Sequence, residues 1–250
     1  FNAGSLKFNS AGAVSIAEDS AMVLAGASTG SAVTLASAAD ISQSTGTITS
    51  AGLLTTTSIG GTVLGNANAV SSFNATNTGG GAITLVNTAA PLTIAGLSQA
   101  GGGTTTITNN GSIKTSGAIG SDGSVAINAT GGVLGASDDV TISNTITLTG
   151  AGTKTLDILA RRNVLFTGGA GVVTTNALNV TLNSDTDANL GGAISLASGT
   201  VIDSKGGFIT LGGGATPASV AAIGISVAPT GIALDNAQLL SGAGAISIRG

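Results

Sequence analysis

The chain has 250 residues, and 144 of them are Gly (41), Ala (40), Thr (35) or Ser (28). Charged residues make up 7% and aromatic residues 2%, and there is no His, Cys, Trp or Tyr, so most side chains used in catalysis and transition-metal binding are missing. The net charge is −4 and the longest basic run is Arg161-Arg162, which argues against nucleic-acid binding.

Hydrophobic residues still make up 42% of the chain, which is too many for a disordered protein. Gly, Ser, Thr or Asn interrupts every apolar stretch well before the roughly 18 residues that a membrane span needs. We therefore expect a folded, soluble chain without a transmembrane segment. The sequence starts at Phe1 without a recognisable signal peptide, as in a mature protein or an excised piece.

Short alternations of apolar and small polar residues recur along the whole chain, which is the pattern of half-buried strands. Neighbouring copies are 19 residues apart from Val14 to Val33, and 42, or twice 21, from Ile83 to Val125. Later copies lie closer, 14 from Val180 to Ile194, as expected if one coil holds two or three strands. The clearest copies are Val14-Ser15-Ile16, Val33-Thr34-Leu35, Ile83-Thr84-Leu85, Val125-Ala126-Ile127, Val180-Thr181-Leu182 and Ile246-Ser247-Ile248.

These strands are too short to bury an apolar side alone, but stacked coils bury it in one continuous interior. We therefore predict an all-β protein, a β-solenoid with about 20 residues per coil, forming a single repeat domain over residues 1–250. About 12 coils are expected, with a rise of about 4.8 Å each. Small residues suit the narrow interior, and Gly and Asn suit the corners.

Three stretches need separate interpretation. Residues 13–25 and 153–166 lack internal Gly and could be read as helices, but in the second stretch Leu156, Ile158 and Ala160 alternate before a turn at 161–163. We predict strands in both. The stretch 212–229 has Gly-rich and Pro-containing ends, which predicts an irregular loop or bulge.

The stretch from Leu178 to Ala215 carries a family resemblance. Its features are the Asn-Ser-Asp-x-Asp turn at 183–187, the Gly-Gly-Ala-Ile run at 191–194 and the Gly-Gly-x-Ile-Thr-Leu-Gly-Gly-Gly run at 206–214. Together with Ala-Arg-Arg-Asn-Val-Leu-Phe at 160–166 and the closing residues 244–250, this stretch resembles the repeat passenger of filamentous-haemagglutinin-like exoproteins, which Gram-negative bacteria export by two-partner secretion. Residues 1–150 match that family only in style.

The resemblance implies a right-handed parallel β-helix and an internal length of the shaft of a larger secreted or cell-surface adhesin. The implied role is non-enzymatic attachment between cells, to a surface or within a biofilm matrix. The implied partners are a matrix polysaccharide or a host or neighbouring cell surface, and an outer-membrane secretion partner for the parent protein. Because a β-solenoid has exposed terminal coils, we also expect end-to-end or lateral self-association.

Asp185, Asp187 and Asn189 place three oxygen-bearing side chains at alternating positions of one turn, a spacing found in calcium loops. However, the following Gly falls one or two positions later than an EF-hand loop requires, and no Glu stands at the twelfth position. We favour a solvated turn whose side chains cap backbone N–H groups, with calcium as the alternative and no other cofactor expected. The pair Asp138-Asp139 is a weaker candidate.

Two other functional classes are alternatives to an adhesin shaft. A β-helical polysaccharide lyase or hydrolase would need a cleft with paired carboxylates, and the eleven scattered acids, five Phe and absence of Tyr and Trp do not favour one. An ice- or surface-binding solenoid would need Thr-x-Thr motifs in register on every coil, and such motifs occur only in a few places, at Thr45, Thr47 and Thr49 and at Thr145, Thr147 and Thr149.

Overall fold

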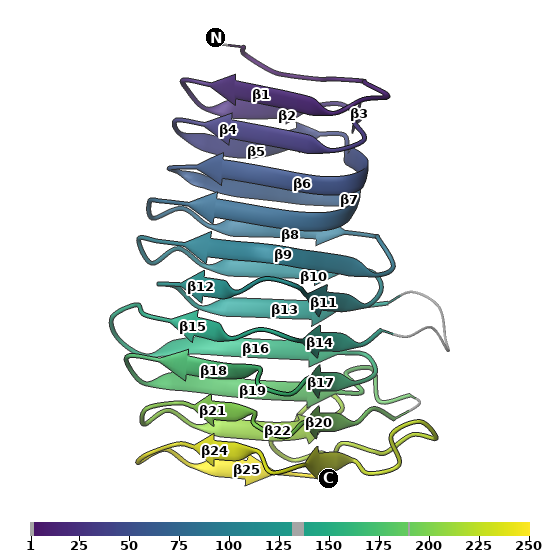
Figure 1. Ribbon diagram of the computed structural model, residues 1–250, viewed down its shortest axis with the longest axis vertical. Coiled ribbons are helices and arrows are strands. Elements are labelled where there is room, and N and C mark those ends of the chain that lie inside the picture. The colour runs from purple at the N-terminus through teal and green to yellow at the C-terminus, as the bar shows by residue number, and fades with distance from the viewer. Residues whose placement is uncertain (1–2, 132–137, 190) are drawn as a thin grey trace.

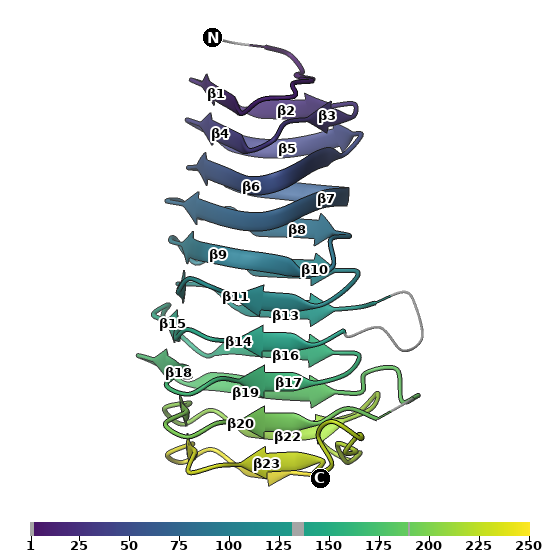
Figure 2. The ribbon, with the colours of Figure 1, turned by 45° about the vertical axis from the view of Figure 1, so that its right-hand side comes forward.

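The computed structural model describes residues 3–131, 138–189 and 191–250. These residues form 25 strands in one continuous sheet, and all strand-to-strand pairings among them are parallel. The chain winds into stacked coils, with the two termini at opposite ends of the stack (Figures 1 and 2). The predicted parallel β-helix is confirmed. Among the described residues no helix is long and apolar enough to cross a membrane.

Each coil contributes strands to three faces, which we call the first, second and third face in the order in which the chain visits them. On the first face, ten strands stack in succession, with part of β7 (Gly61–Asn77) as the third of them. The other nine are β2 (Met22–Ala25), β5 (Asp40–Thr45), β8 (Ile83–Asn87), β10 (Thr105–Asn109), β13 (Val125–Ala129), β16 (Lys154–Ala160), β19 (Leu178–Ser184), β22 (Ile209–Gly213) and β25 (Ile246–Ile248).

The other two faces are built from shorter strands. The second face holds β3 (Ser28–Thr29), β11 (Ile113–Thr115), β14 (Val140–Ile142), β17 (Val164–Phe166), β20 (Ile194–Leu196) and β23 (Ile232–Leu234). The third holds β1 (Val14–Glu18), β4 (Val33–Ser37), β12 (Ile119–Ser121), β15 (Ile146–Leu148), β18 (Gly171–Thr174), β21 (Val201–Asp203) and β24 (Gln238–Leu240). Long strands bend around the corners and serve more than one face: β6 (Ile48–Ser58), β7 and β9 (Leu92–Gln99).

The core is a set of apolar rows that run along the axis of the stack. Alternate residues of each strand point inward, so in-register pairing places one inward Val, Ile or Leu above the next. On the first face this row continues from coil to coil with each side chain 0% exposed: Leu64, Leu85, Ile107, Ile127, Ile158, Leu182 and Leu211. Burying each such side chain contributes about 1.5–3 kcal/mol, and only the neighbouring coils make that burial complete.

The coil length matches the prediction in the first half of the chain and not in the second. Paired residues on the first face are 19 to 22 positions apart from Met22 to Val125. The later separations are 31 from Val125 to Leu156, then 24, 29 and finally 37 from Ile209 to Ile246. The extra residues of the later coils lie at the corner between the first and second faces, as between β13 and β14 and between β22 and β23. Because these coils are longer, the described chain forms ten stacked strands on the first face, fewer than the roughly 12 coils that were expected.

The structure also decides the ambiguous stretches. Both candidate helices are strands, β1 with β2 and β16 with β17, and the predicted turn lies at 161–163 between the latter two. Of the irregular stretch predicted at 212–229, Gly212 and Gly213 belong to β22, and the rest lies in the loop between β22 and β23, where isolated antiparallel bridges join Gly192 to Ile223 and Ile225 to Ala228. Val180 in β19 and Ile194 in β20 lie on the first and second faces of one coil, which accounts for the 14-residue spacing seen in the sequence.

A row of buried asparagines lies at the corner between the first and second faces. Asn68, Asn87 and Asn109 are each at most 1% exposed and occupy three successive coils. The Asn87 Nδ2 donates to Asn109 Oδ1 at 2.9 Å, and the Asn87 Oδ1 accepts the Val70 backbone N–H at 2.9 Å. The amide groups therefore replace the backbone pairing that the ladder loses where the chain turns.

A second buried polar row lies at the corner between the third and first faces. Ser58, Asn77, Gln99 and Ser121 follow one another there from coil to coil. Asn77 and Ser121 each bond the backbone of the turn that follows them, Asn77 Nδ2 donating to the Gly81 carbonyl oxygen at 2.7 Å and Ser121 Oγ to that of Gly123 at 3.0 Å. Gln99 Nε2 reaches back to the turn of the preceding coil and donates to the same Gly81 oxygen at 2.8 Å, while Ser58 Oγ donates to Asn77 Oδ1 at 3.3 Å. Further down the stack, Ser204 and Ser241 close the same turn in the same way.

The asparagine row gives a direct test of what the corners contribute. The change Asn87→Ala leaves buried donors and acceptors of Val70 and Asn109 without partners, so we expect it to lower the free energy of unfolding by about 2–4 kcal/mol. The change Asn128→Ala, on the outward side of β13, is the matched control and should cost under about 0.5 kcal/mol. Urea denaturation measures both. Equal losses would contradict the role of the buried row.

Candidate functional sites

The sequence-predicted residues Asp185, Asp187 and Asn189 lie together in the turn that follows β19. Asp185 adopts a left-handed conformation, with φ at 52°, and its backbone carbonyl accepts the Ala188 N–H at 2.8 Å. The Asp185 Oδ1 accepts the Asn189 N–H at 3.1 Å. The turn is therefore closed by its own side chain, which is the capping arrangement that the sequence favoured.

Arg161 ties this turn to the two preceding coils. Its Nε donates to Asp187 Oδ2 at 2.7 Å, and its Nη1 donates to the Gly131 carbonyl oxygen at 2.7 Å. The same Nη1 lies 4.0 Å from Asp138 Oδ2. Sequence reasoning treated Arg161 only as part of a turn, because nothing in a single sequence shows that residues 26 positions apart meet across neighbouring coils.

The pKa values of the two carboxyl groups near Arg161, those of Asp187 and Asp138, are shifted in opposite directions. Burial acts to raise the pKa of Asp187, but the hydrogen bond from Arg161 and the charge of that guanidinium together outweigh it and lower the pKa. For Asp138, burial is the largest influence and raises the pKa despite the attraction of Arg161, with help from the nearby negative charges of Asp139 and Asp187. Asp187 is thus the carboxylate that the guanidinium holds ionised.

Asp139 and Asn163 form a second link at the same corner. The Asp139 Oδ1 accepts both the Asn163 N–H, at 3.1 Å, and the Asn163 Nδ2, at 2.9 Å. The Asn163 Oδ1 in turn accepts the Ala193 N–H of the next coil at 2.9 Å. We interpret this corner cluster, defined as Asp138, Asp139, Arg161, Asn163 and Asp187, as a set of links that hold the lengthened corners of the later coils in place.

The contacts of the corner cluster bear on the calcium alternative. A calcium ion takes six to eight oxygen ligands and favours carboxylates. Here a guanidinium already bonds Asp187, and its positive charge would repel a cation at the same place. Among the described residues no group of three or more His, Cys, Asp or Glu side chains is arranged to hold a metal ion. Calcium binding stays a prediction without support from this geometry.

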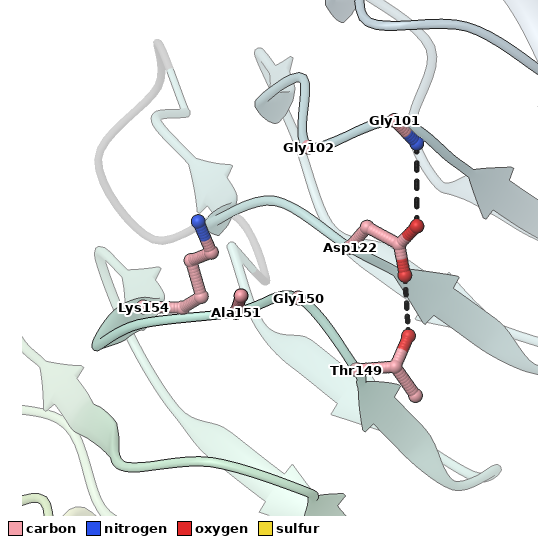
Figure 3. Close-up of a pocket in the computed structure, with 7 residues that line it drawn as sticks. All are labelled: Gly101, Gly102, Asp122, Thr149, Gly150, Ala151 and Lys154. Atoms are coloured by element: carbon pink, nitrogen blue, oxygen red, sulfur yellow. Dashed lines mark hydrogen bonds between the residues drawn. The ribbon is translucent and has the colours of Figure 1, made fainter.

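An open surface hollow of about 370 Å³ lies at the corner between the third and first faces (Figure 3). The Asp122 side chain stands at its centre, where Oδ2 accepts the Gly101 N–H at 3.2 Å and Oδ1 accepts the Thr149 hydroxyl. These three residues come from successive coils. Lys154, at the start of β16, lines the hollow beside Gly150 and Ala151.

The hollow offers little for catalysis. Glycoside hydrolysis uses two carboxyl groups about 5–10 Å apart, and Asp122 is the one carboxylate among the residues that line it. Both oxygens of Asp122 already accept hydrogen bonds from the neighbouring coils. The Asp122 carboxylate therefore links its own coil to the coils on either side through these hydrogen bonds.

The Thr-x-Thr motifs do not stack on one another. Thr147 pairs with Gly120 in the coil before it and with Val173 in the coil after it. Short outward rows do occur on the third face, where Ala36, Thr57, Thr76 and Ser98 follow one another. A row of one or two Thr lacks the repeated array that an ice-binding surface requires, so this geometry does not favour the ice-binding alternative.

Comparison with known proteins found no matching family model, no matching curated protein and no matching solved structure. The fold therefore rests on the structure of the chain itself. The resemblance to filamentous-haemagglutinin-like exoproteins stays a prediction that depends on the residues between Leu178 and Ala215 and their flanking motifs.

The opposite pKa shifts of Asp187 and Asp138 predict different effects on stability when each charge is removed. A lowered folded-state pKa stabilises the protein above the unfolded value near 3.8, and the stabilisation is lost as the pH falls through the folded value. Asp187→Asn should therefore cost about 1–2 kcal/mol at neutral pH, and the difference from wild type should vanish in acid. Asp138→Asn should cost less or stabilise at neutral pH, because it removes a charge that burial disfavours. Urea denaturation at pH values from neutral to about 3 measures both free energies of unfolding. If Asp187→Asn were equally destabilising in acid, the lowered pKa of Asp187 would be contradicted.

Calcium binding can be tested on the intact chain by isothermal titration calorimetry. Because Arg161 bonds Asp187, we expect no saturable heat on addition of Ca²⁺. A saturable signal that disappears in Asp185→Asn would instead establish a calcium site at this turn.

Proposed function

We propose that this chain is a non-enzymatic structural shaft, a length of a large secreted bacterial adhesin that acts as an extended fibre. The observation that carries the proposal is the continuous stack of parallel coils, whose apolar rows and polar corner rows run along one axis from end to end. Such a stack forms an elongated rod, which acts as a spacer between the groups attached at its two ends.

The hydrogen bonds between coils are suited to a load-bearing element. In a parallel β-solenoid, the backbone N–H and C=O groups of one coil bond the coils above and below it, so these bonds lie along the axis. Pulling on the rod therefore loads all bonds of a junction together. The corner links of Arg161, Asn87 and Asn77 add side-chain bonds in the same direction.

The surface supports weak, repeated contact. Outward residues of neighbouring coils include rows of small uncharged side chains, as in Ala36, Thr57, Thr76 and Ser98, which follow one another over four successive coils. A matrix polysaccharide or a cell surface that makes one weak contact per coil would be held by many contacts together. The family resemblance supports export through an outer-membrane partner and a location outside a Gram-negative cell.

The proposal predicts attachment without chemical change. Beads coated with the folded chain should bind matrix polysaccharide or bacterial cells under flow, and retention should rise more steeply than the number of copies per bead, because attachment is multivalent. Beads coated with the urea-unfolded chain are the control. The same polysaccharides should gain no new reducing ends after incubation with the chain. Cleavage of a polysaccharide, or retention equal to that of the control beads, would overturn the proposal.

A further inference from the structure

An exposed aromatic ring stands on the side of the rod. Phe208, directly before β22, is 43% exposed, whereas Phe73 and Phe166 are packed in the core at 0% and 2%. Strand β22 has β19 on one side and β25 on the other, so a coil flanks Phe208 in both directions along the axis (Figure 1). The exposure of this ring is therefore a property of the side face of the rod.

The ring belongs to a strip of five side chains that point outward from the first face. Strand β16 contributes Thr155 and Asp157, and β19 contributes Asn179 and Thr181, which lie beside them in register. Phe208 follows Asn179 in the next coil. From the strand spacing and the two-residue repeat, these side chains cover about 10 Å along the axis and about 7 Å across it. We call these five residues the side strip.

The polar groups of the side strip have bonding capacity left for a ligand. Asn179 Oδ1 accepts the Phe208 backbone N–H at 3.2 Å, which fixes the amide, and no bond from its Nδ2 is found in the described part of the chain. Burial raises the pKa of Asp157, although a hydrogen bond from Thr181 acts to lower it. An amide donor and a partly desolvated carboxyl group therefore face outward beside an aromatic ring.

The loop after β22 forms a raised edge along one side of the strip. A Cβ added to Gly212, on the outward side of β22, would collide with the carbonyl oxygen of Pro217, so this loop lies directly on the face. Thr210, which points outward between Phe208 and Gly212, is only 9% exposed. A ligand on the side strip would therefore have the loop as a wall on one side.

We propose that the side strip binds a neutral hexopyranose unit of a matrix polysaccharide, with Phe208 stacked against the apolar C–H face of the sugar ring. This inference rests on the proposed adhesive function and names the class of glycan that the rod would hold. A pyranose has an apolar face and a rim of hydroxyl groups, and an aromatic ring beside a few placed polar groups matches both. Sugar hydroxyls would donate to the Asp157 carboxylate and accept from Asn179 Nδ2.

The charge of the side strip favours a neutral sugar over an acidic one. Asp157 is the ionisable group of the strip, and a uronate or a sulfate ester beside it would meet a like charge in a partly desolvated setting. Lys205, in the turn before β22, is paired with Asp203, with 2.7 Å between Nζ and Oδ2. Lys154 lines the hollow at the neighbouring corner. The strip itself therefore offers an acidic sugar no cation.

Isothermal titration calorimetry on the intact chain tests the site, with soluble dextran, mannan and galactan as neutral probes and polygalacturonate as the acidic probe. Phe208→Leu keeps an apolar side chain and removes the ring, and Phe208→Tyr is the matched control that keeps the ring. Asp157→Asn removes the charge. Its control is Asp235→Asn, because Asp235 is exposed in the turn after β23, on another face of the rod. Circular dichroism establishes that each variant keeps its strands.

We expect at least one neutral polymer to bind the wild type. Phe208→Leu and Asp157→Asn should each weaken that binding by about tenfold or more, because they remove the stacking surface and the charged acceptor. Phe208→Tyr and Asp235→Asn should bind within about twofold of the wild type, since neither changes a contact with the sugar. Polygalacturonate should bind more weakly than the neutral polymer.

Equal binding by the wild type, Phe208→Leu and Asp157→Asn would overturn the inference. So would tighter binding of polygalacturonate, or no binding of any neutral probe. Failure of the proposed function has a different signature, because beads coated with the folded wild type would then be retained no better than beads coated with the unfolded chain. If folded beads are retained and Phe208→Leu beads are retained equally well, adhesion stands and the side strip is not its site.

Discussion

A single coil of this chain cannot bury its own apolar side chains, and the rest of the structure follows from that constraint. Leu85, Ile107 and Ile127 become fully buried only because in-register parallel pairing places each above the next. The same pairing fixes which residues share a row, so a change of one residue in register would turn the whole inward set to the surface. Stability is therefore a property of neighbouring coils and their junctions.

At the corners, buried polar side chains allow the chain to turn while neighbouring coils stay hydrogen-bonded. Where the backbone leaves the ladder, buried Asn87 and Asn77 supply the missing donors and acceptors. Where later coils are longer, Arg161 and Asn163 link the lengthened turns across coils through the carboxylates of Asp187 and Asp139. Of the polar groups that the sequence offered as possible sites, Asp187 and Asp139 link neighbouring coils, whereas Asp185 and Asn189 bond within their own turn.

The fold was predictable because its signal is local. Period-2 alternation at Val125-Ala126-Ile127 or Val180-Thr181-Leu182 identifies a strand without knowledge of its neighbours, and these strands are β13 and β19. Coil length in the second half was not predictable, because the residues inserted at a corner carry no periodicity. The partners of Arg161 and Asn87 were hidden for a related reason: they lie about one coil away, and the register that joins them is known only once the coils are stacked.

Hydrogen–deuterium exchange of the folded chain tests the dependence of each coil on its neighbours most directly. If stability is held at the junctions, amide protection should be highest in the interior strands β8, β10 and β13, which have a coil on both sides, and should fall toward β25, which has a coil on one side. Equal protection along the whole chain, or a protected block confined to one end, would contradict the account.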